Sequence, residues 1–418
     1  MKVHPAHDVD IVIAGGGAAG LSLALGLCHS TTLSVAVIEA KPFDADQHHP
    51  GFDARSVALA RYSIERLTDN GLGNAATLGS AIKHIHVSDK GRLGTCSMQA
   101  EQFGVNELGR VIELHELGQA LHQALTPYVN KQLQLFCPDS IAALEQQDDG
   151  IQVALQSGLQ LHAKLLVVAE GAQSPTRALL GFEVNETDYQ QTAVIANVTT
   201  NQPHAGRAFE RFTNTGPVAL LPLTSHSHER SAGRWSLVWS VNPSDAASLL
   251  NCSEAQFAHQ LQSAFGYRAG IIQHVGQRGS YPLKLIHASE HIRHRAVVIA
   301  NCAQSLHPIA GQGLNLGLRD VYSLLSVLRE AVSLHQDIGA YSVLHQYQRL
   351  QKRDQARTIS MTDSLVRLFS NDYFPLTFAR NAGLYALHQL SPLKKQFADV
   401  AMGKGTRNQL AQSIKERT

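Results

Sequence analysis

The chain has 418 residues, a hydrophobic content of 44% and a formal net charge of +1, from 35 basic and 34 acidic side chains. It is long enough to bury a sizeable core and too long for one ordinary domain, so we expect two domains. The balanced charge and the lack of a long basic run argue against nucleic acid as a partner, because proteins that bind it carry a concentrated basic surface.

The five cysteines are at least 41 residues apart, so the sequence contains neither a CxxC pair nor a local zinc motif. The N-terminus carries one Lys before Asp8 and Asp10, which is a poor start for a secretory signal. We therefore expect a cytoplasmic protein. Residues 11–38 hold no charged side chain, but their three consecutive glycines and the polar stretch 29–32 divide them into strand, turn, helix and strand rather than a membrane span.

The first predicted element is a strand over residues 11–14, followed by a glycine turn and a helix that begins near Ala18. Gly15, Gly17 and Gly20 stand in the G-x-G-x-x-G spacing of dinucleotide-binding turns. The first glycine permits the tight turn, the second lets the backbone approach a pyrophosphate, and the third lets the helix pack on the strand. The free N–H groups at the N-terminus of the helix favour the phosphates.

The second predicted strand ends at Glu39, 19 residues beyond Gly20. A carboxylate at this place in a β-α-β unit binds the hydroxyls of an adenosine ribose and disfavours a 2′-phosphate. The sequence therefore indicates FAD or NAD rather than NADP. The alternative interpretation is a glycine turn with an unrelated glutamate.

Two later apolar strands also end in polar loops. Residues 165–169 precede Glu170 and Gly171, and residues 297–300 precede Asn301. Continuous apolar strands are typical of a parallel sheet that is covered on both faces, and ligands bind beyond the carboxyl ends of such strands.

The loop after the last of these strands reads LHPIAGQGLNLGLRD. Gly311 and Gly313 let the backbone lie close to a ligand, and Pro308 fixes the turn beside them. We expect a helix to begin between Gly311 and Asn315, with its unpaired N–H groups and its dipole facing a flat anionic group. The alternative is a capped core helix that follows a strand.

These motifs, in this order, resemble those of the FAD-dependent aromatic hydroxylases built like para-hydroxybenzoate hydroxylase. Glu170-Gly171 with Arg177 resembles the DG motif of that family, and Ala300-Asn301 resembles its GD motif. The segments HPGFDARSVALA, VIELHELGQAL and HPIAGQGLNLGLRD are similar to those of the ubiquinone-biosynthesis hydroxylases within the family. The resemblance covers most of the chain.

The resemblance implies FAD as the cofactor and the residues that bind it, which are Gly15, Gly17, Gly20, Glu39, Arg55, Gln119, Glu170, Gly171, Asn301, Pro308, Gly311, Gly313, Leu314 and Asn315. Arg55 suits the pyrophosphate, although a surface salt bridge is the alternative, and Gln119 either reaches FAD or is solvated on its helix. Glu170 and Asn301 depart from the Asp that the family usually has. We expect FAD to bind nevertheless, because an amide oxygen still accepts a hydrogen bond.

The resemblance also implies a monooxygenase that hydroxylates the aromatic ring of a polyprenylated phenol with O2. No second strand-GxGxxG-helix unit follows the first, so we expect NAD(P)H or a separate reductase to supply electrons without a nicotinamide domain in this chain. Other ubiquinone-biosynthesis proteins are implied as partners. His307 is a candidate for proton transfer, and the alternative is a structural, hydrogen-bonded histidine.

The element pattern predicts an α/β fold, with a Rossmann-like FAD-binding domain of mainly parallel sheet and a substrate domain of antiparallel sheet. We assign the FAD-binding domain to residues 1–70, 100–182 and 282–345, the substrate domain to residues 71–99 and 183–281, and a C-terminal helical region to residues 346–418.

Three groups of side chains have two interpretations each. One group either lines the substrate cleft or lies in the core: Leu220, Pro222, Trp235 and Trp239. A second would share one face of a helix and could then bind a metal, although we expect no metal: His287, His291 and His294. A third either gives a peripheral contact with the inner face of the membrane or packs on the FAD domain: Phe369, Tyr373, Phe374, Phe378, Lys394 and Lys395.

Other flavoprotein activities fit the sequence less well. A disulfide reductase needs a close pair of cysteines, and a flavin halogenase needs a WxWxIP motif, whose spacing the segment WSLVW does not match. The remaining alternative is a catalytically weak flavoprotein scaffold in a ubiquinone-biosynthesis complex, which the departures at Glu170 and Asn301 motivate.

Overall fold

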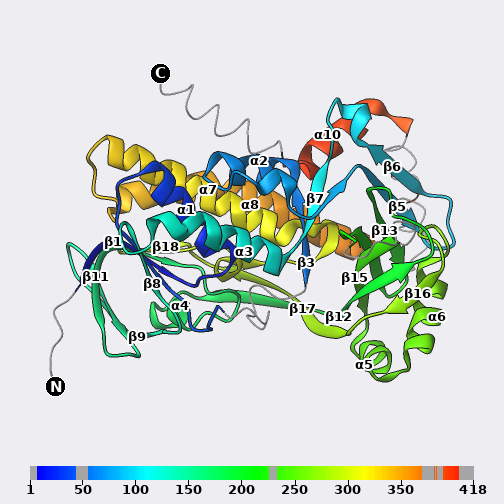
Figure 1. Ribbon diagram of the computed structural model, residues 1–418, viewed down its shortest axis with the longest axis horizontal. Coiled ribbons are helices and arrows are strands. Elements are labelled where there is room, and N and C mark those ends of the chain that lie inside the picture. Colours follow the sequence, from blue (N-terminus) through cyan, green and yellow to red (C-terminus); the bar gives the residue numbers. More distant parts are fainter. Residues whose placement is uncertain are drawn as a thin grey trace.

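The computed structural model describes residues 7–43, 55–225, 233–369, 381, 383 and 389–403. Figure 1 shows an elongated molecule with a mainly parallel sheet at one end, an antiparallel sheet at the other, and long helices that run between them. The mixed α/β fold predicted from the sequence is confirmed.

The elements around the parallel sheet are β1 His7–Ala14, α1 Ala18–Ser30, β2 Val35–Ile38, β3 Ser56–Ala60, α2 Arg61–Asp69, β4 Ser80–Ile82, β7 Gly109–Glu113, α3 Leu114–Leu125, β8 Leu133–Phe136, β9 Ile141–Gln146, β10 Ile151–Leu155, β11 Gln160–Val168, α4 Pro175–Leu179, β18 Ile292–Arg293, β19 Ala296–Val298, η4 Ala300–Cys302, η5 Ile309–Gly311, α7 Gln312–Ser333 and α8 Tyr341–Phe369. The elements around the antiparallel sheet are β5 His84–Asp89, β6 Thr95–Gln99, β12 Val184–Thr200, β13 Arg207–Thr213, β14 Gly216–Pro222, β15 Gly233–Val241, α5 Pro243–Asn251, α6 Glu254–Phe265, β16 Ile272–Val275, β17 Gly279–Ala288, β20 Gln304–Ser305 and the C-terminal helix α10 Ser391–Ala401.

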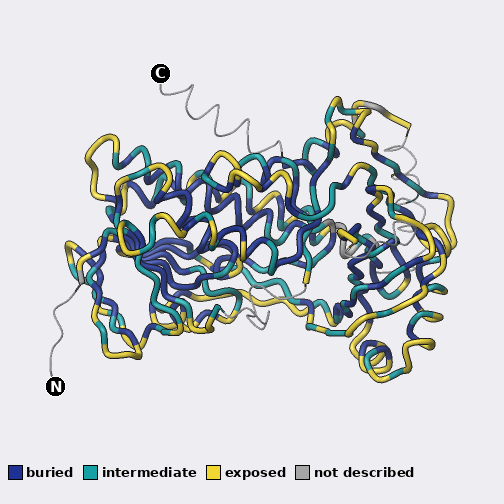
Figure 2. The backbone as a smooth tube through the Cα atoms, viewed as in Figure 1, coloured by how far each residue is buried: buried dark blue, intermediate teal, exposed yellow. Residues whose placement is uncertain are grey.

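The parallel sheet has the strand order β18-β19-β11-β1-β2-β8, and β10 and β9 add to it beside β11. Side chains of the central strand β1 alternate between the two faces, as those of any strand do. Ile11 and Ile13 pack under α1, α3 and α7, whereas Val12 and Ala14 pack in the layer on the other side. Figure 2 shows these strands as the most deeply buried part of the chain. Burial on both faces explains why their sequences are continuously apolar.

Helix α1 is apolar all round because it lies between the sheet and other helices, and residues 18–28 are buried throughout. Its Gly26 lets α7 approach closely, since a Cβ there would lie 2.5 Å from the side chain of Leu325. The first helix of the chain is thereby fixed against the helix that begins beside the last strand.

The antiparallel sheet has the order β20-β17-β12-β15-β14-β13-β5-β6, with β16 beside β12. Helices α5 and α6 cover one of its faces, where the side chains of β15 pack against Phe257 and Leu261. The other face lies toward the nucleotide side of the molecule, where Leu223 packs with Val111 and Ala58.

Leu220, Pro222, Trp235 and Trp239 lie in the core of the antiparallel sheet and do not line a cleft. Leu220, Trp235 and Trp239 belong to the cluster under α5 and α6, and Pro222 is buried opposite Trp235. Residues two apart on a strand share a face, so all four point toward the helices. The residues that alternate with these four along the strands point to the opposite face, toward the nucleotide side.

Two predicted domain boundaries differ from the observed packing. Leu72, Ala75 and Leu78 belong to the core beneath α1, so the nucleotide side of the chain extends past the boundary at residue 71. Strand β17 pairs with β12 as far as Ala288, beyond the boundary at residue 282. The hydrophobic pattern of β17, the antiparallel partner of β12, does not change at residue 282. The sequence alone therefore does not mark the boundary between the two domains there.

His287, His291 and His294 do not share a helical face, because they lie at the end of β17, in a turn and after β18. Among the described residues, no group of three His, Cys, Asp or Glu side chains is placed to hold a metal ion. The aromatic residues Tyr373, Phe374 and Phe378 lie outside the described residues, so the predicted membrane contact stays a prediction.

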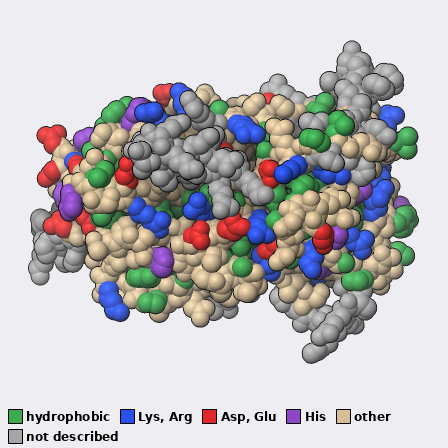
Figure 3. All heavy atoms as spheres, turned by 90° about the horizontal axis from the view of Figure 1, so that it is seen from above, with side chains coloured by type: hydrophobic (Ala, Val, Ile, Leu, Met, Phe, Trp, Pro, Cys, Tyr) green, Lys and Arg blue, Asp and Glu red, His purple; other side chains and the backbone are tan. Residues whose placement is uncertain are grey.

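Over the same described ranges, no helix combines the length and the apolar composition that crossing a membrane requires. On the face of the molecule seen in Figure 3, basic and acidic side chains are interspersed, in keeping with the near-zero net charge.

Candidate active site

Four strand ends meet at one edge of the parallel sheet. Ala14 at the end of β1 is in register with Ile38 of β2 and Val168 of β11, and Val168 is in register with Val298 of β19. Backbone hydrogen bonds continue past the strands, from Ala169 N–H to the carbonyl of Ala14 at 2.7 Å and from Gly15 N–H to that of Ile38 at 2.8 Å. The loops that the sequence singled out therefore lie side by side.

The three glycines after β1 have different surroundings. Gly15 has a φ of +106°, and a Cβ there would lie 2.7 Å from the backbone of Ala169. A Cβ on Gly20 would lie 1.9 Å from the carbonyl oxygen of Gly15. Gly17, by contrast, has open space around its Cβ position, with nothing within 4 Å. Gly15 and Gly20 thus serve the fold, and Gly17 leaves room for a ligand at the helix N-terminus.

Glu39 at the end of β2 points back to the glycine loop. Its carboxylate accepts a hydrogen bond from Gly16 N–H at 2.8 Å and one from Lys41 N–H at 2.9 Å. It lies beside the N-terminus of α1, where an adenosine ribose and the adjoining pyrophosphate of a dinucleotide would reach both groups.

Glu170 is turned toward the short helix α4. Its carboxylate accepts hydrogen bonds from the hydroxyls of Ser174 and Thr176, at 2.5 and 2.7 Å, and from Thr176 N–H at 3.1 Å. The carboxylate of Glu170 thus binds the first turn of α4, whose N-cap is Ser174. The side chain of Arg177 on α4 donates to the carbonyls of Ala172 and Cys302, so this loop is tied to the loop after β19.

Asp320 of α7, which the sequence did not single out, fixes the loop after β19 through hydrogen bonds. Ala300 has a φ of +54°, and its N–H donates to the Asp320 carboxylate at 2.9 Å. The amides of Gln304 and Gln355 donate to the same carboxylate, at 2.5 and 3.2 Å. Asp320 is fully buried, and burial raises its pKa to about 7. Asn301, next to Ala300, remains exposed at the strand end.

Helix α7 begins where the sequence predicts. Its first residue, Gln312, follows Gly311, which has a φ of +61° and, as a glycine, has no side chain of its own to cap the helix. No acidic residue occupies the first turn, so no carboxylate of the helix itself offsets the positive end of its dipole. Gly313 has open space around its Cβ position, as Gly17 does.

Asn315 contributes to this helix end through its side chain. The amide oxygen accepts from Ala60 N–H and the Ser63 hydroxyl, and the amide nitrogen donates to the carbonyls of Ala58 and Gly311, each at 2.8 Å. The hydrogen-bonding capacity of the amide is therefore fully used within the protein. Only the backbone of Asn315 is left for a cofactor, and its side chain fixes the position of the helix end.

The structure favours the structural interpretation of His307. The ring is fully buried, its Nδ1 accepts from Ile309 N–H at 3.2 Å, and its Nε2 lies 3.2 Å from the side-chain oxygen of Gln191 on β12. Burial lowers its pKa to about 4, so it is neutral at physiological pH. Nε2 then carries the proton and donates to Gln191. His307 joins the loop before α7 to the antiparallel sheet.

The other predicted contacts lie around this edge. Leu314 is partly exposed in the first turn of α7, and Pro308 precedes η5. Gln119 is exposed on α3, and the carbonyl of Arg55 accepts from Leu114 N–H at the start of that helix. Gly171 has a φ of +97° and open space around its Cβ position.

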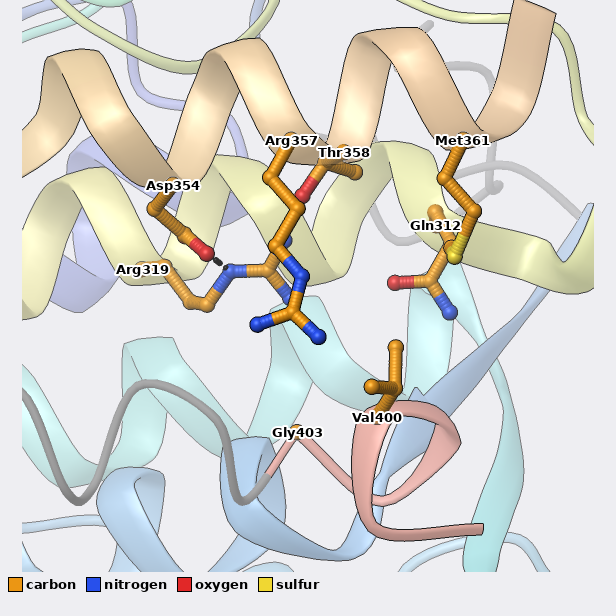
Figure 4. A pocket seen from close by; sticks show the side chains of 8 residues that line it. All are labelled: Gln312, Arg319, Asp354, Arg357, Thr358, Met361, Val400 and Gly403. Carbon is orange, nitrogen blue, oxygen red and sulfur yellow. Dashed lines mark hydrogen bonds and ion pairs between the residues drawn. The ribbon is translucent and has the colours of Figure 1, made fainter. Parts of the chain in front are cut away.

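The cavity drawn in Figure 4 lies along α7 on the side that faces α8 and α10. Arg357 points into it, beside Arg319, whose guanidinium pairs with Asp354 at 2.7 Å. Its volume of about 30 Å³ accommodates water molecules and is far too small for an aromatic substrate. We therefore assign it to helix packing and place the site at the strand ends.

Taken together, these residues fit FAD. The open space at Gly17, the carboxylate of Glu39 and the glycine-started N-terminus of α7 match a pyrophosphate, a ribose and an anionic ring edge, respectively. The two helix N-termini that the site needs come from elements nearly 300 residues apart in the chain.

Residues 8–356 of the chain match the family model described as FAD binding domain. The chain belongs to this family. The flavoprotein hydroxylase resemblance predicted from the sequence is confirmed, and the protein is an FAD-dependent monooxygenase.

Among curated relatives, the flavoprotein is 35% identical over 400 residues to the ubiquinone hydroxylase UbiL of Rhodospirillum rubrum, with 94% of this chain and 89% of the relative covered. It is 33% identical over 408 residues to the 3-demethoxyubiquinol 3-hydroxylase of Escherichia coli, with 95% and 99% covered.

Solved structures share its fold. The p-nitrophenol 4-monooxygenase PnpA of Pseudomonas putida gives a TM-score of 0.75 at 17% identity, with 94% of this chain and 97% of that chain covered. An FAD complex of HpxO from Klebsiella pneumoniae gives a TM-score of 0.70 at 16% identity, with 94% and 98% covered.

The different surroundings of Gly17 and Gly20 lead to a first prediction. We expect Gly17→Val to fold but to lose FAD, because its side chain enters open space that the pyrophosphate needs. The matched variant Gly20→Val should fail to fold or unfold at a much lower temperature, because its Cβ meets the Gly15 carbonyl. Flavin absorbance and thermal unfolding of both variants check this. A yellow, fully loaded Gly17→Val protein would contradict the assignment.

Asp320 leads to a second prediction. Its pKa in the folded state, about 7, lies above the ordinary value of 3.8, so folding stability is lost as the pH rises from about 4 through about 7. Asp320→Asn cannot ionise, so the variant should lose less stability than the wild type over this range. Denaturant unfolding at pH 5 and pH 8 measures the difference. Equal losses in the two proteins would show that the carboxylate is already ionised at pH 5.

His307 leads to a third prediction, on the pH dependence of hydroxylation. With a pKa of about 4 and no exposure to solvent, His307 does not titrate in the neutral range. We expect His307→Asn, which keeps an acceptor for Ile309 N–H, to change the rate without changing the shape of the pH profile above pH 6. Loss of one limb of the profile in this variant would instead establish a proton-transfer role.

Proposed function

We propose that this flavoprotein hydroxylase acts in ubiquinone biosynthesis, where it places one oxygen atom of O2 on the ring of a polyprenylated phenol. The proposed substrate is 2-octaprenyl-6-methoxyphenol, and the proposed position is para to the phenol hydroxyl. The names and the near-complete coverage of the two curated relatives support the pathway, and the motif resemblance supports the substrate.

The observation that carries the proposal is the glycine-started N-terminus of α7, which follows Ile309, a residue that packs in one cluster with Phe212 of the antiparallel sheet. Bound FAD would supply the activation of O2, which no amino-acid side chain provides. The first turn of α7 would stabilise the negative charge of the reduced ring with its N–H groups, and Gly313 would let the ring lie against the backbone.

An apolar strip on the antiparallel sheet is the proposed floor for the phenol ring. It consists of Ile195, Ala219, Leu221 and Val238, which share one face by strand register and are each partly exposed. These are the neighbours of the buried residues under α5 and α6, and they lie on the opposite face of the sheet. An apolar floor excludes water from the reacting ring and holds it in position.

Tyr281 stands at the end of this strip, in register with Ala193. Burial raises the pKa of its phenol, although the positive charge of Arg55 opposes the rise, so Tyr281 stays protonated. It is therefore available as a hydrogen-bond donor toward the substrate oxygen. Electrons would come from NAD(P)H or from a separate reductase.

A fourth prediction tests the function directly. The purified protein with FAD, a reductant and 2-octaprenyl-6-methoxyphenol under ¹⁸O2 should give a product that carries one labelled oxygen, and fragmentation should locate the label para to the hydroxyl. The FAD-free Gly17→Val protein is the control. Label at another ring position would overturn the proposed position, and reducible bound FAD without any product would favour the scaffold alternative.

A further inference from the structure

A basic cavity lies on the outer face of the antiparallel sheet, away from the flavin site. It has a volume of about 490 Å³ and is lined by His84, His86, Ser97, Gln99, Ala205, Arg207, Phe209 and Arg268. We call these eight residues the cationic hollow. In Figure 1 its strands β13, β5 and β6 lie at the end of the molecule farthest from the parallel sheet.

Strand register explains why these side chains converge. Arg207 of β13 pairs with His84 of β5, which pairs with Gln99 of β6. One step along, Phe209 pairs with His86, which pairs with Ser97 of β6. Two parallel rows across three neighbouring strands thus point to the same side of the sheet.

This side of the sheet is the one that α5 and α6 cover elsewhere. Phe209 continues the buried cluster, with its ring 5.6 Å from those of Trp235 and Phe265. Helix α6 does not cover the two rows of side chains from β13, β5 and β6. Arg268, in the turn after this helix, lines the same cavity. The opposite side of the same strands packs toward the loop before α7, because Ile85, Phe212 and Ile309 share one cluster.

Positive charge gathers beside the hollow at Arg211, which lies two residues after Phe209 on β13. Burial lowers the pKa of Arg211, the positive charge of Arg268 lowers it further, and the buried Nε of Arg211 has no hydrogen-bond partner. Across the described ranges, neither Arg207 nor Arg268 forms an ion pair with a carboxylate, and Arg207 donates only to the carbonyl of His204. Asp89 is the acidic group whose charge opposes the repulsion at Arg211. An anion in the hollow would relieve this repulsion.

We propose that the cationic hollow binds a phosphate-bearing small molecule of nucleotide size. Its two guanidinium groups suit a diphosphate, since guanidinium matches phosphate oxygens in pairs. Its volume falls within the range of small-molecule sites and exceeds what inorganic phosphate fills. The partly exposed ring of His86 packs edge to face on the buried Phe209, with 6.0 Å between ring centroids, and offers the hollow an aromatic surface for a base.

The test uses the FAD-loaded full-length protein and ADP as the probe. Calorimetry should give one saturable site, and the emission of Trp235 and Trp239, the two tryptophans of the chain, should change in parallel because Trp235 packs directly behind Phe209. Flavin absorbance should stay constant, which separates this site from the adenine end of the FAD site. Binding should weaken with added salt, because the hollow is open to solvent.

Two variants and a control locate the site. Arg207→Gln and Arg268→Gln should each weaken ADP binding about tenfold or more, because each removes charge-assisted hydrogen bonds. Lys131→Gln, an exposed cation on the FAD side, should leave it unchanged. The hydroxylation rate of the two arginine variants should equal that of the wild type, because the hollow lies apart from the flavin site.

Three results would overturn the proposal. They are no saturable binding at about 1 mM ADP, equal affinity in the wild type and both arginine variants, or release of flavin in step with ADP binding. Inorganic pyrophosphate is the second probe. If pyrophosphate binds more weakly than ADP, the ligand is a nucleotide. If the two bind with equal affinity, recognition of the base is overturned.

Discussion

Parallel pairing of β1, β2, β11 and β19 in one register is the constraint on which the site depends. Because the four strands end level with one another, the loops after them lie within contact of each other, although they are drawn from both halves of the chain. The close contact of Gly20 with Gly15 then fixes α1 on this edge. Shifting one strand by a residue would turn its side chains to the wrong layer and separate its loop from the others.

Helix α7 is the second fixed element, and buried polar groups hold it in place. Asp320 supports the strained Ala300, Asn315 fixes the helix end to β3 and α2, and Arg319 pairs with Asp354 of α8 at 2.7 Å. Gly317 completes the arrangement, since a Cβ there would lie 2.8 Å from that of Ala300. These polar groups are hydrogen-bonded within the protein, so the N-terminus of α7 is held in one position, as the proposed flavin contact requires.

Two contacts join the antiparallel sheet to the nucleotide side of the molecule. Arg234 of β15 pairs with the buried Glu113 at the start of α3 through both carboxylate oxygens, at 2.8 and 2.9 Å. His307 reaches Gln191 of β12 from the loop before α7. These contacts set the position of the apolar strip relative to the flavin end of α7. The proposed floor for the substrate ring and the proposed flavin site are therefore held in place by the same few side chains.

The sequence alone determined the local units of this protein. The glycine motif, Glu39 and the helix start after Gly311 follow from short-range patterns, because a turn, a strand and a helix end are set by neighbouring residues. The tertiary structure decided which face each strand presents, since Trp235 and Trp239 could be cleft or core until the sheet was covered by α5 and α6. It also decided the hydrogen-bond partners of Asp320, Glu170 and His307. Their partners lie 4 to 116 residues away, and no local pattern specifies contacts over the longer of these distances.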